Sequence, residues 1–172
     1  RGNNTEKLYE VPAQQWADIT DESGEYGVSI INDCKYGWDK PEDNILRLTL
    51  IHTPRGSYGS NNQHLQDLGE NRFQFSIYGH KGDWVAGDTV TQGERVNQPL
   101  RVFQSEKHDG ALGKEFSFLT IDNPHVTVKA IKQAEDSEDI IVRVVETSGK
   151  NHLNVKLNIG HGIAEAVEVN GY

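Results

Sequence analysis

Phe73-Gln74-Phe75-Ser76-Ile77-Tyr78 alternates apolar and polar side chains almost without fault. A period of two turns one set of side chains toward a core and the other toward water, which is typical of a half-buried β-strand. Residues 26–31 and 45–50 are good strand candidates as well. Four later segments complete the set, at 125–131, 140–145, 153–159 and 164–169. Two shorter segments, at 101–103 and 116–119, are weaker candidates.

Evidence for helices is thin. Only residues 84–96 have a pattern that fits a helix, and Gly87 and Gly93 argue against a long one, since each glycine costs about 1 kcal/mol relative to alanine. Many strands without helical patterns between them favour an antiparallel sandwich over alternating β–α units. We predict an all-β fold, mainly an antiparallel β-sandwich with little helix, in a single domain over residues 1–172.

Composition excludes several classes of partner. The chain has 172 residues, with 17 Lys and Arg against 26 Asp and Glu, so its net charge is −9. An acidic chain repels phosphate backbones, and no stretch approaches the ~20 apolar residues of a membrane helix, so we expect neither nucleic acid nor a membrane as partner. The lone Cys34 cannot form an internal disulfide and points to a reducing compartment, so we expect a cytoplasmic protein.

The sequence contains no methionine, even at position 1. We therefore expect a fragment of a larger protein. A sandwich separated from its neighbours should expose apolar surface or an unpaired strand edge, which makes a homo-oligomer possible.

A dense polar segment follows the candidate strand at 26–31 and reads Asn32-Asp33-Cys34-Lys35-Tyr36-Gly37-Trp38-Asp39. Carboxylates and amides bind sugar hydroxyls, and aromatic faces stack on sugar C–H groups, so these residue types suit glycan recognition. An ordinary turn explains them as well, with Asn32 and Asp33 making local backbone hydrogen bonds. Residues 79–84 form a second loop of aromatic and charged side chains, to which both interpretations apply.

Catalytic and metal-binding patterns are weak. None of the seven histidines has the His-x-x-x-His spacing, and Cys34 has no cysteine partner, so we predict no metal site in this chain. A retaining glycosidase needs two carboxylates about 5–5.5 Å apart. Asp33, Asp39, Asp67 and Asp83 lie near candidate strand ends, but ordinary surface acids explain them more simply.

An ordered series of segments resembles the C-terminal region of glycoside hydrolase family 38 α-mannosidases. The series includes the motif Asn32-Asp33-Cys34-Lys35-Tyr36-Gly37 and spans nearly the whole chain, in the order 9–18, 26–28, 32–37, 45–50, 67–69, 73–78, 80–84, 97–100 and 128–132 with Glu135. The chain is most similar to the cytosolic branch of the family and its bacterial relatives.

This resemblance implies a C-terminal β-sandwich that belongs to a retaining exo-α-mannosidase, which hydrolyses terminal α-mannosides in mannose-containing glycans. The catalytic Asp nucleophile, the acid/base carboxylate and the ligands of zinc or a similar divalent metal would lie in an upstream domain, followed by a helical domain. No catalytic residue, metal ligand or cofactor is expected in the present chain, which should be inactive alone.

The resemblance also implies a place for this chain at the rim of the substrate pocket. Asn32, Asp33, Lys35 and Tyr36 fall on the matched motif, and Arg55 follows a matched strand, so these five residues are the predicted substrate-binding residues. Two alternatives stay open: a free-standing carbohydrate-binding β-sandwich module, and a purely structural or interaction domain.

Overall fold

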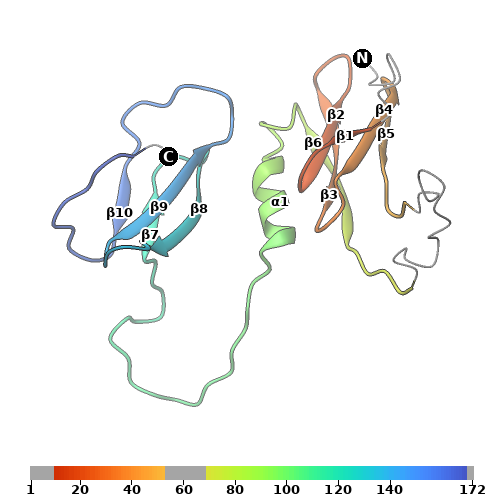
Figure 1. The fold of residues 1–172 in the computed structure, drawn as a ribbon. Helices are drawn as coiled ribbons and strands as arrows, with labels where there is room; N and C mark the ends of the chain where they lie inside the picture. Colours follow the sequence, from red (N-terminus) through yellow and green to blue (C-terminus); the bar gives the residue numbers. More distant parts are fainter. Residues whose placement is uncertain (1–9, 53–68, 170–172) are drawn as a thin grey trace. The chain divides into compact units, whose positions relative to one another are not determined.

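The computed structural model describes residues 10–52 and 69–169. Its elements are mostly short antiparallel strands with one helix (Figure 1). In chain order they are β1 (Val11–Pro12), β2 (Trp16–Thr20), β3 (Tyr26–Asn32), β4 (Gly37–Glu42), β5 (Ile45–Leu48), β6 (Phe75–Lys81), α1 (Thr89–Asn97), β7 (Leu119–Ile121), β8 (Val126–Gln133), β9 (Ile140–Glu146) and β10 (Leu157–Ile159). The prediction of a mainly antiparallel all-β fold with little helix is confirmed.

The chain divides into two compact units, Arg1–Val102 and Phe103–Tyr172. The first contains β1 to β6 and α1, and the second contains β7 to β10. Whether these two units form the single domain predicted over residues 1–172 stays a prediction. Within the described residues, no helix is long and apolar enough to cross a membrane.

The central sheet of the first unit has the strand order β2-β3-β6, and both pairings are antiparallel. Ser29 of β3 lies opposite Asp18 of β2 and Tyr78 of β6, which fixes the register of all three strands. Directly opposed residues share a face of the sheet, so odd positions of β3 point to one side and even positions to the other.

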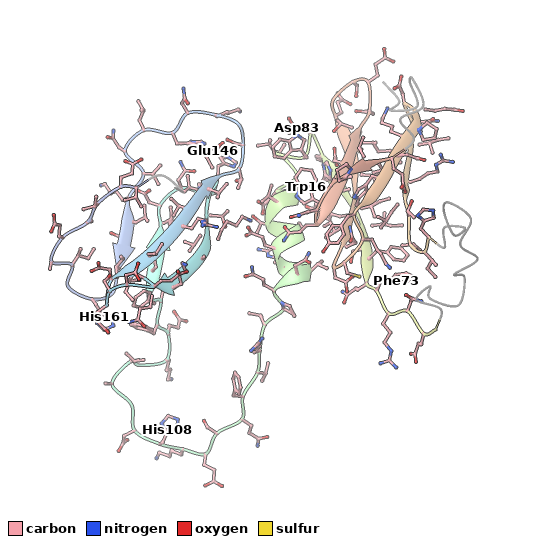
Figure 2. The ribbon with its side chains drawn as sticks, viewed as in Figure 1. Trp16, Phe73, Asp83, His108, Glu146 and His161 are labelled. Carbon is pink, nitrogen blue, oxygen red and sulfur yellow. The ribbon has the colours of Figure 1, made fainter. Side chains whose placement is uncertain are left out.

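Helix α1 covers the face that carries the odd positions of β3 (Figure 1). Gly93 lets the helix approach Trp16 of β2, because a Cβ at this position would lie 3.0 Å from the indole ring. Trp16 also packs on Trp84, with 5.4 Å between ring centroids (Figure 2 labels Trp16). Gly93 therefore weakens the helix locally but permits the contact that holds it on the sheet.

A second sheet of the first unit has the order β1-β4-β5. Trp38 of β4 is its buried anchor, 2% exposed, and the indole N–H donates to the backbone oxygen of Ala13 at 3.0 Å. The β4–β5 ladder shifts register between Asp39 and Glu42. Such a bulge bends the strand near the turn that joins β4 to β5.

The second unit contains two antiparallel pairs, β8 with β9 and β7 with β10. The β8–β9 ladder runs from Val126 opposite Glu146 to Gln133 opposite Ile140, with one register shift. The acidic residues 135–139 lie in the turn that connects these two strands.

The strands predicted from alternation are confirmed at 26–31, 45–48, 75–78, 126–131 and 140–145. Predictions at 101–103 and 164–169 are wrong, since the structure has no strand there. Of the predicted strand at 153–159 only 157–159 is a strand, and of the weaker candidate at 116–119 only residue 119 belongs to one. Alternation shows which face a strand would present, but a strand also needs a neighbour for its backbone groups.

His80 of β6 fits a slot between two glycines. A Cβ at Gly27 would overlap the His80 ring and lie 2.9 Å from Nε2, and a Cβ at Gly87 would overlap the ring from another side. Gly79, on the same strand as His80, has open space where a Cβ would stand. The His80 ring thus fits in this position only because Gly27 and Gly87 have no side chain.

We expect Gly27→Ala to lower the free energy of unfolding by about 1–3 kcal/mol, the usual cost of overpacking a buried site. Urea unfolding followed by tryptophan fluorescence measures it, because Trp16, Trp38 and Trp84 all lie in the first unit. Gly79→Ala is the matched control and should leave the midpoint nearly unchanged. Equal losses in the free energy of unfolding for the two substitutions would contradict this packing of His80.

Candidate functional site

Residues 32–37, called here the Asn32 loop, connect β3 of one sheet to β4 of the other. The Asn32 carboxamide oxygen accepts hydrogen bonds from the backbone N–H groups of Cys34 (3.1 Å) and Lys35 (2.6 Å), which closes the turn. The side-chain nitrogen of Asn97, at the end of α1, donates to the backbone oxygen of Asn32 at 3.1 Å. Asn32 is 1% exposed, so its side chain shapes the loop from inside.

Asp33 links the loop to the segment before β6. Its carboxylate accepts from the backbone N–H of Gln74 at 3.0 Å, and its own N–H donates to the Gln74 oxygen at 3.2 Å. A hydrogen bond from the Cys34 thiol, followed by that of Gln74, lowers the pKa of Asp33, and the same thiol contact raises the pKa of Cys34. A raised thiol pKa leaves less thiolate, so Cys34 is poorly suited to act as a nucleophile.

Lys35 and Tyr36 are the outward groups of the Asn32 loop. The Lys35 ammonium lies 4.9 Å from the centre of the Phe73 ring, which orients it by a cation–π contact (Figure 2 labels Phe73). Tyr36 is exposed. The structure thus brings four of the predicted residues into one loop: Asn32, Asp33, Lys35 and Tyr36. Arg55 lies outside the described residues.

The other carboxylates considered from sequence have separate partners. Asp39 forms a two-point ion pair with Arg47, at 2.6 and 2.5 Å. Asp83 accepts from the N–H groups of Val85 and Ala86, which makes it part of a turn. Asp67 lies outside the described residues. These arrangements argue against a catalytic carboxylate pair among the described candidates.

A buried polar cluster, which sequence reasoning missed, joins β2, β3, β6 and α1. The Asp18 carboxylate oxygen Oδ2 lies 2.7 Å from both Ser29 Oγ and His80 Nε2, and Thr89 Oγ1 lies 2.9 Å from Ser29 Oγ. A hydrolytic triad needs serine and carboxylate on opposite ring nitrogens. Here both contact Nε2, and Ser29 and Thr89 are fully buried, so the cluster is structural.

A second histidine–carboxylate cluster lies in the other unit, at the end of β9 (Figure 2 labels Glu146). Glu146 accepts from the Ser148 hydroxyl and N–H (2.5 and 2.6 Å), from the Gly149 N–H (2.7 Å), and lies 3.1 Å from His152 Nε2. These contacts, the Ser148 hydroxyl first, lower the pKa of Glu146 to about 2. His125 stacks on His152. The cluster closes the turn that follows β9.

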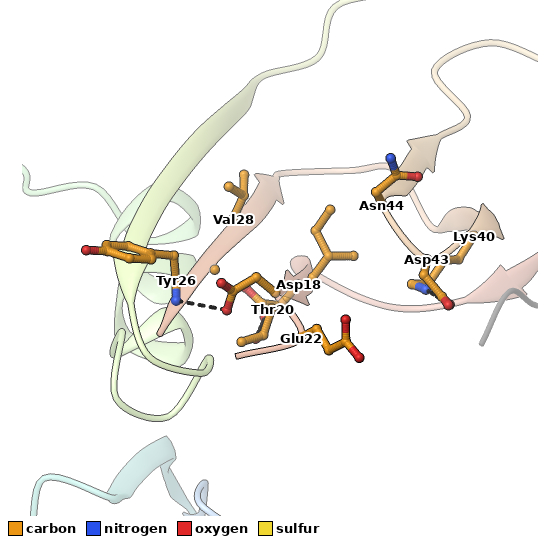
Figure 3. A pocket seen from close by; sticks show the side chains of 11 residues that line it. Asp18, Thr20, Glu22, Tyr26, Val28, Lys40, Asp43 and Asn44 are labelled. Carbon is orange, nitrogen blue, oxygen red and sulfur yellow. Dashed lines mark hydrogen bonds and ion pairs between the residues drawn. The ribbon is translucent and has the colours of Figure 1, made fainter. Parts of the chain in front are cut away.

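A pocket of about 870 Å³ opens at the β2–β3 turn (Figure 3). Ile19, Tyr26 and Val28 supply its apolar lining, β4 supplies Lys40, and the turn after β4 supplies Asp43. Lys40 pairs with Asp43 at 2.8 Å and lowers the pKa of that carboxyl. Within the part of the chain that the structure describes, no group of three or more His, Cys, Asp or Glu side chains could hold a metal ion.

Two models of one family match opposite ends of this chain. The model of the glycosyl hydrolases family 38 C-terminal domain matches residues 1–56, and the model of the family 38 C-terminal β-sandwich domain matches residues 125–171. This chain is a C-terminal region of glycosyl hydrolase family 38. The first match lies in the first unit and includes the Asn32 loop, whereas the second lies in the second unit.

Relatives of this family 38 region are named α-mannosidases. Alpha-mannosidase G of Dictyostelium discoideum is 27% identical over 142 residues, which cover 82% of this chain and 12% of the relative. An α-mannosidase of Saccharomyces cerevisiae is 29% identical over 168 residues, which cover 88% of this chain and 14% of the relative. The chain thus spans about an eighth of the length of the relatives it matches.

The Glu146 cluster predicts how the stability of the second unit of this family 38 region depends on pH. A carboxyl whose pKa falls from 4.5 to about 2 on folding stabilises the folded state fully above pH 4.5 and loses this contribution as the pH falls toward 2. Hydrogen exchange in peptides over residues 140–152, corrected for intrinsic rates, should show protection falling across this range. Glu146→Gln should flatten that dependence and lower protection at neutral pH.

Glu138→Gln is the matched control, because Glu138 is exposed in the turn between β8 and β9. Its pH profile should follow that of the unsubstituted protein. If Glu146→Gln also left the profile unchanged, the cluster would contribute nothing to stability.

Proposed function

We propose that this chain is the C-terminal β region of a retaining exo-α-mannosidase that removes terminal α-mannose from glycans. The observation that carries this proposal is that two named α-mannosidases align with 82% and 88% of the chain. In the enzyme, this region acts as a scaffold and as part of the rim of the substrate pocket.

The chemistry is assigned to domains that precede this region in the enzyme. An Asp nucleophile there displaces the leaving group from the anomeric carbon, while an acid/base carboxyl protonates the leaving oxygen and then activates the water that releases mannose, with net retention. A divalent metal such as zinc, when bound in that domain, orients and polarises sugar oxygens. The separate partners of Asp33, Asp39 and Asp83 support placing this chemistry outside the present chain.

The Asn32 loop is assigned to the rim. Asp33, with its lowered pKa, offers carboxylate acceptors, Lys35 offers a positioned ammonium, and Tyr36 offers an exposed aromatic face. Buried Asn32 is a positioning residue that holds the loop. Arg55 is proposed to bind a sugar hydroxyl on the strength of its place after a matched strand.

The partners that follow from this proposal are the upstream catalytic and helical domains of the same polypeptide and mannose-containing glycans. A cytoplasmic location, expected from the lone Cys34, is part of the same proposal.

Hydrolysis of an aryl α-mannoside tests the activity. The longer enzyme, extended upstream to its natural start, should hydrolyse the substrate and should lose this activity when a chelator removes its divalent metal. The 172-residue chain should be inactive with or without added metal.

Activity of the 172-residue chain alone would contradict the proposal and return attention to Asp33, Asp39, Asp67 and Asp83. Glycan affinity of that chain, combined with an inactive longer enzyme, would support a carbohydrate-binding module instead.

Lys35→Ala in the longer enzyme tests the rim. Loss of a hydrogen bond from a charged group should raise KM about tenfold, equivalent to about 1.4 kcal/mol, with little change in kcat if the contact is equal in ground and transition states. Lys107→Ala is the control, since Lys107 is exposed in the other unit and should leave KM unchanged. Equal KM values for the two variants would remove Lys35 from the rim.

A further inference from the structure

The last residue of α1 connects the helix to the Asn32 loop. The side-chain nitrogen of Asn97 donates to the backbone oxygen of Asn32 at 3.1 Å and to that of Gly93 at 2.8 Å. Because both partners are carbonyl oxygens, the carboxamide must turn its nitrogen toward them, which fixes its orientation. One amide group thus joins the end of the helix to the start of the loop.

The side of α1 that carries Asn97 is attached to the sheet. Thr89, Gly93 and Asn97 are four residues apart, so they lie on one side of the helix. Thr89 is fully buried and contacts Ser29 Oγ at 2.9 Å, and Gly93 lies close against the Trp16 indole. Asn97 therefore extends from a helix whose position the sheet already fixes (Figure 1).

The backbone oxygen of Asn32 lies at a weak point of the sheet. The β2–β3 ladder ends with Trp16 opposite Ile31, so this oxygen is one residue beyond the last pair. The Asn32 N–H still donates to the Gln15 oxygen at 2.7 Å. Within the described residues, the buried side-chain nitrogen of Asn32 has no hydrogen-bond partner. The carboxamide of Asn32 therefore holds the residue at its oxygen alone, and the bond from Asn97 supplies a further point of attachment.

We propose that Asn97 is a positioning residue that determines where the Lys35 ammonium lies, through the backbone of Asn32. The Asn32 carboxamide oxygen accepts from the Lys35 N–H at 2.6 Å, so a shift of Asn32 moves Lys35 with it. This inference rests on the proposed function, in which the Asn32 loop belongs to the rim of the substrate pocket. It adds a residue of α1 to those that determine how tightly the rim binds a sugar.

Capping of α1 alone would explain only one of the two contacts of Asn97. The bond to the Gly93 oxygen stays within the helix, whereas the bond to Asn32 leaves it. A serine hydroxyl commonly bonds the carbonyl four residues earlier in a helix, but it is one bond shorter than the asparagine amide. Asn97→Ser therefore keeps the contact within α1 and removes the contact to the loop.

Kinetics of the longer enzyme with an aryl α-mannoside test the inference. Asn97→Ser should raise KM about threefold, the effect of having to order one long side chain on binding, with kcat changed by less than about twofold. Gly27→Ala is the control for a loss of stability, because Gly27 lies against His80 at the other end of β3, and it should leave KM unchanged. An unchanged KM in Asn97→Ser, or an equal rise in both variants, would overturn the inference.

A double substitution tests whether Asn97 acts through Lys35. Lys35→Ala removes the group that is positioned, so Asn97→Ser should raise KM less in that background than in the unsubstituted enzyme. If the two single effects on KM multiplied fully, Asn97 would act by another route and the inference would be wrong.

Hydrogen exchange of the loop gives a readout that does not need hydrolysis. Peptides over residues 32–37 of the longer enzyme should exchange about threefold faster or more in Asn97→Ser, because the N–H groups of Cys34 and Lys35 are bonded to Asn32. Arg95→Ala is the matched control, since Arg95 is exposed in the last turn of α1 and contacts Gln92 at 3.3 Å. It should leave exchange of the loop unchanged. Equal exchange in the two variants would overturn the inference.

Failure of the inference and failure of the proposed function give different results. If the unsubstituted longer enzyme hydrolysed no mannoside while loop exchange rose in Asn97→Ser alone, the proposed function would be wrong and the inference would be supported. Hydrolysis with both KM and loop exchange unaffected by Asn97→Ser would support the proposed function and overturn the inference. Faster loop exchange with an unchanged KM in an active enzyme would overturn the inference as well.

Discussion

The buried carboxylate of Asp18 is the polar centre of the first unit. It lies 2.7 Å from Ser29 Oγ and from His80 Nε2, and Ser29 in turn contacts Thr89, so one carboxylate connects three strands and the start of α1. A buried charge is costly unless it is paired and hydrogen bonded. The register of β2, β3 and β6 therefore has to keep these partners together, since a slip by one residue would turn them to the opposite face.

The same register determines what the other face of the sheet presents. Because Ser29 and His80 point toward α1, the neighbouring residues Val28 and Ile77 point away from it. The side that faces the helix carries the buried polar groups of Ser29, His80 and Thr89, and the opposite side carries Val28 and Ile77. The polar side is physically consistent because hydrogen bonds within the unit satisfy its buried groups.

The alternation of side chains predicted β3 and β6 well, because both strands are seven residues long and keep a period of two over most of that length. It missed β2 and β4, since Trp16–Thr20 mixes an aromatic, a carboxylate and a hydroxyl, and Gly37–Glu42 contains a proline and two charges. The Asn32 loop was predicted both as a polar turn and as a recognition loop. The local backbone hydrogen bonds predicted for Asn32 are present, whereas Asp33 bonds to the distant Gln74. The hydrogen bond from the Asn97 side chain to the Asn32 backbone oxygen could not be predicted, because the two residues are 65 apart in sequence.

The Asn32 loop also explains how a scaffold region can present side chains to a ligand. Its inner residue is held by β3 and α1, and Asp33 is tied to the segment before β6, so the backbone of the loop is fixed at several points. Fixed backbone lowers the conformational entropy that the outward side chains lose on binding. Lys35 loses less still, because its ammonium already lies over the Phe73 ring. Helix α1 is bonded to the sheet through Thr89 and to the Asn32 loop through Asn97. The contacts that stabilise the first unit therefore also pre-organise the loop for binding.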